Sequence, residues 1–228
     1  MFARMHLGLV LIAALIVSGC ATPTKMAFEN EADKVKNDKA VFLLTTTLKN
    51  GYKTSYQPKA IVLHVERASV KDSSDRLNFL MDDKAKIELD TVQAGNTYLV
   101  RMELEPGDYV IRGVTGFSGV FPVRGTFFAP LHAEVKATQP GVYYLGHVAA
   151  TVRERQENEF RAGPPIPLVD QAVTGFSSGT FDVVVSDRFD QDEQMFKTRF
   201  PVLREASIRK APLPPFDRAK AQKWWEAQ

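Results

Sequence analysis

Residues 98–113 read YLVRMELEPGDYVIRG, and the alternation in this stretch decides the fold class. Apolar side chains occupy every second position of its first half, namely Tyr98, Val100, Met102 and Leu104. The second half continues with Tyr109, Ile111 and Gly113 after the turn signal Pro106-Gly107. A period of two is that of a β-strand with one buried face. We therefore expect a β-hairpin in which Leu104 lies opposite Tyr109 and all the apolar side chains share one face.

A second hairpin is predicted over residues 131–148 on the same reasoning, with its turn at 138–141. Pairing Ala137 with Val142 places His132 directly opposite His147, on the face away from the apolar side chains, with Glu134 diagonal to His147. Two imidazoles and a carboxylate could bind zinc or report pH. The alternative, an ordinary polar pair across two strands, is the more common arrangement.

Further strands with the same period are expected at 41–48, 61–66, 84–90 and 181–185. A helix is predicted near 189–200, where Asp190 to Glu193 have the form of a capping box and Pro201 ends the helix. A short C-terminal helix, capped by Asp217, follows the proline-rich residues 212–215. The sequence thus predicts a mainly β protein, an antiparallel β-sandwich of the Ig-like or transthyretin-like kind, with one interior and one C-terminal helix.

The N-terminus has the pattern of a secretory signal peptide. Arg4 supplies a positive charge, residues 7–17 are apolar, and Ser18-Gly19 are small. The apolar run is shorter than the ~18 residues that a membrane-spanning helix needs. Val17-Ser18-Gly19-Cys20 resembles the lipobox of bacterial lipoproteins. That resemblance implies a diacylglycerol thioether on Cys20, cleavage before it, and acylation of the new amino group.

Ala21 follows the predicted lipidated cysteine. In Gram-negative bacteria an aspartate at this position commonly retains lipoproteins in the inner membrane, so in such a host Ala21 favours the outer membrane, with the protein facing the periplasm. Residues 20–40 are polar and are expected to form a tether that keeps the folded body clear of the lipid. The predicted organisation is a cleaved leader (1–19), the lipidated tether (20–40), the sandwich (41–210) and a C-terminal segment (211–228).

Composition excludes several classes of function. Cys20 is the only cysteine, so the chain forms no intramolecular disulfide, and a lipidated sulfur cannot serve as a catalytic thiolate. The chain has 29 basic and 27 acidic residues without a basic block, so nothing indicates nucleic acid as a partner. We expect no cofactor other than the covalent lipid on Cys20.

Residues 175–179, GFSSG, match the G-x-S-x-G pattern of a nucleophile elbow, with Ser177 as the candidate nucleophile. That elbow needs a strand before the serine and a helix after it, whereas a strand is predicted after it here. The chain also has no histidine beyond His147, so the usual order of acid and then histidine cannot be met. We interpret the segment as a flexible loop and a hydrolase as the minor alternative.

Two motifs resemble known β-sandwich families. Residues 104–109, LEPGDY, are similar to the L-x-P-G-x-Y turn of carboxypeptidase-regulatory and transthyretin-like domains. Residues 139–146 and 186–201 resemble segments of bacterial lipoproteins that carry a sandwich of that kind. The resemblance implies a fold and carries no catalytic residue, because function taken from a fold alone is analogy.

These observations lead to three hypotheses about function. The first is a non-enzymatic envelope lipoprotein, anchored to the membrane by its lipid, whose sandwich binds a protein or a cell-wall partner. The second is an envelope hydrolase or metal-binding protein that uses Ser177 or the His132/His147 pair. The third is a carrier with a small apolar molecule between its sheets, which would require a large internal cavity.

Overall fold

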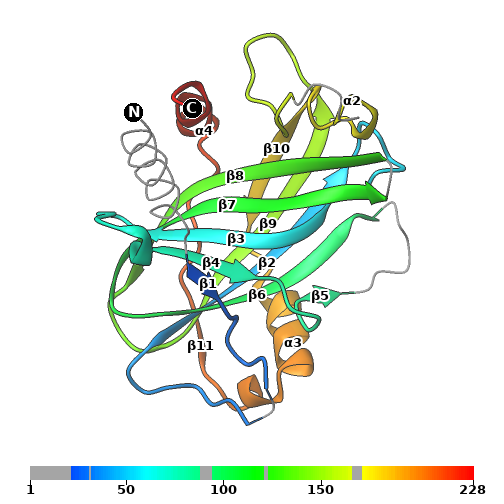
Figure 1. The fold of residues 1–228 in the computed structure, drawn as a ribbon. Helices are drawn as coiled ribbons and strands as arrows, with labels where there is room; N and C mark the ends of the chain where they lie inside the picture. Colours follow the sequence, from blue (N-terminus) through cyan, green and yellow to red (C-terminus); the bar gives the residue numbers. More distant parts are fainter. Residues whose placement is uncertain (1–21, 31, 88–93, 121–122, 166–170) are drawn as a thin grey trace, which may run out of the picture.

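The computed structural model describes residues 22–30, 32–87, 94–120, 123–165 and 171–228. Two β-sheets pack face to face with short helices at their margins, so the predicted mainly β sandwich is confirmed (Figure 1). Sheet I has the strand order β1-β4-β3-β7-β8, and sheet II has the order β10-β9-β2-β6-β5, with β11 also paired to β9. Both sheets are mixed rather than purely antiparallel, because β1 runs parallel to β4 and both β2 and β11 run parallel to β9.

The strands of sheet I are β1 (Thr22–Thr24), β3 (Lys59–Arg67), β4 (Arg76–Leu80), β7 (Gly107–Val120) and β8 (Val123–Ala137). Those of sheet II are β2 (Ala40–Asn50), β5 (Lys86–Ile87), β6 (Asn96–Leu104), β9 (Gly141–Glu154), β10 (Gly179–Ser186) and β11 (Ile208–Lys210). The helices are α2 (Gln171–Thr174), α3 (Phe189–Arg199) and α4 (Arg218–Glu226), with the 3₁₀ turns η1 (Ser73–Asp75) and η3 (Pro201–Leu203). Of the strand predicted at 84–90, residues 88–90 lie outside the described residues.

Both predicted hairpins are wrong, although their strands and turns are where the sequence places them. β6 belongs to sheet II and β7 to sheet I, so the turn at Pro106 carries the chain from one sheet to the other. The turn at Pro140 does the same between β8 in sheet I and β9 in sheet II. A hairpin would set the apolar side chains of its two strands beside each other, whereas here they meet across the core. The alternation of apolar residues is the same in both arrangements.

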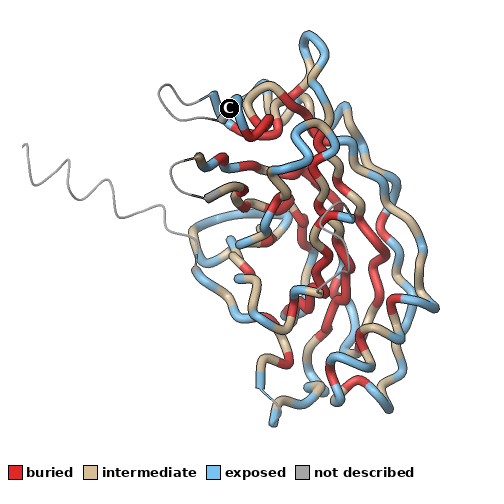
Figure 2. The backbone as a smooth tube through the Cα atoms, turned by 90° about the vertical axis from the view of Figure 1, so that its right-hand side faces the viewer, coloured by how far each residue is buried: buried red, intermediate tan, exposed pale blue. Residues whose placement is uncertain are grey.

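The main core lies between the sheets. Met102 of sheet II and Ile111 of sheet I are both fully buried there, as are Leu63, Phe79 and Phe181. Figure 2 shows buried residues running along the strands and exposed residues gathering in the loops. α4 contacts β8, which is the last strand of sheet I, and this packing protects a strand edge from pairing with another chain.

A second, smaller core lies on the outer face of sheet II. Phe196 and Phe200 from α3 and its C-terminal end pack with Val41, Leu43 and Leu99. Phe28 from the N-terminal segment joins the same cluster and is 3% exposed. β2 is therefore covered on both faces, which explains its continuous apolar run at 41–44.

The N-terminal segment does not form the predicted free tether over residues 22–30. β1 adds a strand to sheet I beside β4, and Met26 is only 4% exposed. The Ala27 amide donates a 3.0 Å hydrogen bond to the carbonyl of Arg101. The segment is polar in composition, yet its two large apolar side chains, Met26 and Phe28, are both buried.

The two main helices differ in how they begin. α4 starts as predicted, with the Asp217 side chain accepting a 2.9 Å hydrogen bond from the Lys220 amide. In α3 the predicted cap is wrong, because the helix begins at Phe189 and has no side-chain cap. Asp192 is fully buried instead of sitting in an exposed capping box. Its carboxylate accepts a hydrogen bond from the Tyr144 hydroxyl beneath α3.

Candidate functional site

A recess with a volume of about 1130 Å³ lies beside α3. We call it the α3 cleft. Its walls are α3, the segment joining β4 to β5, and the adjacent ends of β3 and β7. Met81, Ile87 and Met195 line it together with the charged side chains Asp83, Lys86 and Arg199. Flexible methionines and charges of both signs suit a protein segment, because thioether side chains adapt to irregular surfaces.

The packing of α3 decides which of its side chains face the cleft. Phe196 is buried against sheet II, and this leaves Gln194 and Thr198, one helical turn apart, exposed along the cleft. Arg199 closes the end of the cleft by donating 3.1 Å hydrogen bonds to the carbonyls of Asp83 and Lys84. These bonds hold the segment joining β4 to β5 against α3, so two walls of the cleft are fixed relative to each other.

A polar network lies buried beneath α3. The Tyr144 hydroxyl donates a 2.6 Å hydrogen bond to Asp192 and accepts one of 3.2 Å from the Arg188 amide. Nη1 of Arg188 lies 3.5 Å from Nε2 of His147, so that nitrogen is the acceptor and Nδ1 bears the proton. Nδ1 lies 4.0 Å from the Asp192 carboxylate.

Burial controls the ionisation of this network. It raises the pKa of the Tyr144 phenol, and the hydrogen bond to Asp192 raises that pKa further. Burial likewise lowers the pKa of His147, with a smaller contribution from the Arg188 charge, while Asp192 opposes both. A neutral imidazole and a neutral phenol around one carboxylate are what a low-polarity environment favours.

A smaller recess of about 220 Å³ opens next to the network and shares Ile87 and Met195 with the α3 cleft. Thr45, Thr97 and His147 line it. Within the described part of the chain, Thr45 Oγ1 and His147 Nδ1 are buried without a hydrogen-bond partner. The recess therefore provides a small polar extension to the cleft.

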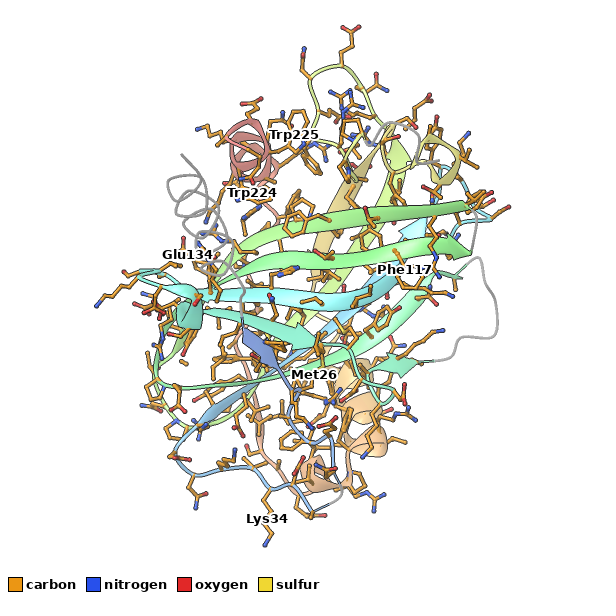
Figure 3. The ribbon with its side chains drawn as sticks, viewed as in Figure 1. Met26, Lys34, Phe117, Glu134, Trp224 and Trp225 are labelled. Carbon is orange, nitrogen blue, oxygen red and sulfur yellow. The ribbon has the colours of Figure 1, made fainter. Side chains whose placement is uncertain are left out.

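His132 and His147 do not face each other, so the predicted pair is wrong. His132 lies on β8 in sheet I, and His147 lies on β9 in sheet II. His132 packs at a tilt against Trp224, with ring centroids 4.9 Å apart, and it has a φ of 50° at a bulge in β8. Figure 3 shows Trp224 on α4. Burial, followed by the charges of Arg112 and Lys220, lowers its pKa to about 4. At neutral pH His132 is therefore an uncharged part of the α4 interface.

Glu134 accepts a 3.2 Å hydrogen bond from Lys220 on α4. It belongs to the sheet I side with His132 and forms an exposed ion pair there. Over the described ranges, no group of three His, Cys, Asp or Glu side chains is placed to hold a metal ion.

Ser177 lies between α2 and β10, so the order is helix before and strand after, opposite to a nucleophile elbow. Residues 175–178 form the predicted loop, and it is anchored to the body. Phe176 is fully buried, and its carbonyl accepts a 2.9 Å hydrogen bond from the Gly163 amide. Gly175 has a φ of 83°, which glycine adopts without strain. The segment is a tight, anchored turn.

Cys20 lies outside the residues that the structure describes, so its role stays a prediction. Of the helices in the described ranges, none combines the length and the apolar character needed to cross a membrane. In the described part of the chain, the recess that Leu44, Leu63 and Val148 line between the sheets holds about 10 Å³, which is too small for the apolar ligand that the carrier hypothesis would place there.

Two central side chains of the site were not found from the sequence. The capping-box pattern of residues 190–193 predicts an exposed Asp192, and the alternation of Val100 and Met102 predicts that Arg101 between them points away from the core. Arg101 is fully buried, and it donates hydrogen bonds to Ala27 (2.8 Å), Leu99 (2.9 Å) and Asp82. The sequence holds one indication of this burial. The unbroken apolar run at 41–44 predicts that β2 is covered on both faces, and the same cover can extend to the outer face of β6, which carries Arg101.

Comparison with known proteins gave no further assignment. No family model matches the chain, and neither the curated proteins nor the solved structures gave a significant match. The structure supports a β-sandwich, and the likeness to transthyretin-like domains and to lipoproteins remains one of motifs.

Proposed function

We propose that this chain is a non-enzymatic envelope lipoprotein that uses the α3 cleft to bind a partner protein. In this proposal Cys20 carries the lipid and holds the protein at the outer membrane of a Gram-negative host, facing the periplasm. The signal-peptide pattern and the lipobox of residues 17–20 support the anchor. The observation that supports binding is the α3 cleft, a recess of about 1130 Å³ with an adaptable apolar lining.

A protein segment suits the cleft better than a cell-wall glycan. Met81, Ile87 and Met195 can bury apolar side chains of an extended segment. Asp83 and Lys86 add charges of opposite sign, which favour one orientation and register of a bound chain. A sandwich displaying such a cleft also agrees with the lipoprotein resemblance of residues 139–146.

The anchor is tested by metabolic labelling with radioactive palmitate. The wild-type chain should incorporate label and fractionate with the outer membrane, and Cys20→Ser should lose the label. Label retained by Cys20→Ser would refute lipidation at this residue.

The cleft is tested by placing a photo-crosslinking amino acid at Gln194 or at Thr198 in growing cells. Val184 serves as the control position, because its side chain is 60% exposed on β10, outside the cleft. We expect the same protein adduct from positions 194 and 198 and none from 184. The identified partner, once purified, should bind the wild type and lose binding with Gln194→Arg/Thr198→Arg.

An adduct at 184 alone, or purified-partner binding that is indifferent to the double substitution, would rule out the cleft. Binding of purified peptidoglycan fragments that the double substitution abolishes would identify a glycan partner instead.

A further inference from the structure

The distance between the proposed lipid and the folded body is short. β1 begins at Thr22, two residues after Cys20. Because a residue spans at most about 3.6 Å of extended chain, the two Cα atoms lie within about 7 Å of each other. β1 is held to β4 in a register that pairs Pro23 with Asn78, and the burial of Met26 fixes the chain that follows.

This inference rests on the proposed lipidation of Cys20. With the lipid in the bilayer, the first strand of the sandwich lies at the headgroups, since no spacer separates them. One surface of the body must then rest on the membrane. We propose that this surface is the outer face of sheet I and that its ligand is a bilayer surface bearing anionic lipids.

The outer face of sheet I is less covered by other elements than that of sheet II, and this favours sheet I as the surface that contacts the membrane. The outer face of sheet II lies beneath α3 and the N-terminal segment, as the cluster around Phe28 and Phe196 shows. On sheet I, β4, next to β1, turns Phe79 into the core and Leu80 outward, and Leu80 is 44% exposed. Val62 on the neighbouring β3 pairs with Leu80, so it lies on the same outer face, and it is half-buried. Figure 1 shows sheet I turned toward the viewer, with strands of sheet II behind it and α3 below, at the lower right.

Charge favours the same face. Arg76, Arg124 and Lys59 are exposed on strands of sheet I, and none of them forms an ion pair within the described residues. Glu66, which lies opposite Arg76, is bonded to Arg112 instead. Each basic residue near an anionic membrane contributes about 1 kcal/mol of attraction. The alternative is contact through the loops at the Thr22 end of the sheet. There Asp72 and Asp75 offset Arg67 and Lys71, so attraction to anionic headgroups is weak.

An aromatic side chain on the same side of the body also favours contact with the membrane. Trp224 packs at a tilt against Phe128, which β8 presents on the outer face, with ring centroids 5.0 Å apart. Trp224 is half-buried, so part of its ring is available to the headgroup region, where indole side chains are favoured. Trp225 instead packs against the main core, so it serves as a tryptophan that the membrane is not expected to contact.

The test uses the full lipidated chain reconstituted in vesicles of equal parts phosphatidylglycerol and phosphatidylcholine. The lipid-modified sulfur of Cys20 cannot react with a thiol reagent, so Leu80→Cys and Val184→Cys each accept one environment-sensitive fluorophore. These are exposed aliphatic positions on the outer faces of sheets I and II, at 44% and 60% exposure. We expect the label at 80 to brighten several-fold with a blue shift, and the label at 184 to stay water-exposed.

An independent measurement uses Trp225→Phe, which leaves Trp224 as the single tryptophan. Brominated lipids should quench it, and they should quench the Trp224→Phe protein less. Vesicles of phosphatidylcholine alone should reduce both the fluorescence change at position 80 and the quenching of Trp224. In these vesicles the basic side chains have no anionic headgroups to bind.

The outcomes separate the two proposals. If the protein floats with the vesicles but the label at 80 stays in water, the sheet I orientation is wrong and the anchor stands. Shielding at 184 instead of 80 also overturns the orientation. Shielding at 80 that disappears when excess lipid dilutes the protein identifies a second copy of this chain as the occupant, against the proposal. If the protein neither floats nor incorporates palmitate, the proposed anchor itself fails.

Discussion

The hydroxyl of Tyr109 donates a 2.9 Å hydrogen bond to the carbonyl of Glu105, four residues upstream, across the turn that carries the chain from sheet II to sheet I. The other crossing repeats the arrangement, since the Tyr143 hydroxyl donates a 3.1 Å hydrogen bond to the carbonyl of Gln139. Both corners have the sequence x-P-G-x-Y. Such a tyrosine corner fixes how a strand leaves a turn between two sheets.

Tyr109→Phe should lower the free energy of unfolding by about 1 kcal/mol, because a buried hydroxyl bond is lost and a carbonyl is left without its partner. Tyr109 is 2% exposed, whereas Tyr143 is half-buried and water can replace its bond. Tyr143→Phe should therefore cost less. Urea unfolding of both variants checks the order, and an equal or reversed loss would show that the corners do not stabilise the fold in this way.

The repeated corner also explains how far the sequence could predict the fold. The alternation around Met102 and Ile111 identified the strands, the turns and the buried faces correctly. It could not say whether the two strands pair, because one inward face serves a hairpin and a sheet crossing equally well. The motif shared by residues 105–109 and 139–143 was the available signal, since its tyrosine bonds back across the turn.

The candidate site was harder to predict for a related reason. His132 and His147 were brought together only by the assumed pairing of β8 with β9. Once those strands lie in different sheets, each imidazole meets side chains from a distant element: Trp224 in one case and Asp192 in the other. Contacts made by helices over an outer sheet face leave no period in the strands themselves, so a single sequence does not reveal them.

His132 predicts how stability depends on pH. Its folded pKa of about 4 lies below the ordinary value of 6.5, so between these values the unfolded chain binds the proton more readily. The stabilisation is complete above pH 6.5 and is lost as the pH falls toward 4, by at most about 3 kcal/mol. His132→Asn should flatten this loss, because asparagine tolerates the positive φ and does not titrate.

Unfolding measured at pH 8 provides the reference for that variant, since the imidazole is uncharged there and any difference reflects packing against Trp224. Arg112, Lys220 and Glu66 face His132 and remain in place in the variant. A slope between pH 6.5 and 4 as steep in His132→Asn as in the wild type would assign the effect to other groups, of which His147 is the first to test.

The Tyr144–Asp192 bond predicts a strong coupling beneath α3. Asp192→Ala should cost about 2–4 kcal/mol, because it leaves the buried Tyr144 hydroxyl without an acceptor for its proton. Tyr144→Phe/Asp192→Ala should cost less than the sum of the single changes, with a coupling of about 1–3 kcal/mol. Chemical unfolding of the four proteins gives this value, and additive losses would mean that the bond contributes little.

Arg101 should decide whether the N-terminal segment stays on the body. Its buried guanidinium donates to the Ala27 carbonyl and to Asp82, and it lies 4.2 Å from the centre of the Phe200 ring. Arg101→Lys keeps the charge but cannot make these contacts together, because an ammonium has no planar fork of donors. We expect faster hydrogen exchange at the Ala27 amide with little change in the central strands of the sandwich. Release of the segment also lengthens the link to Cys20, so the label at position 80 should lose its shielding by the bilayer. A variant that exchanges Ala27 rapidly while position 80 stays shielded would show that the face of sheet I holds the membrane without help from the short link.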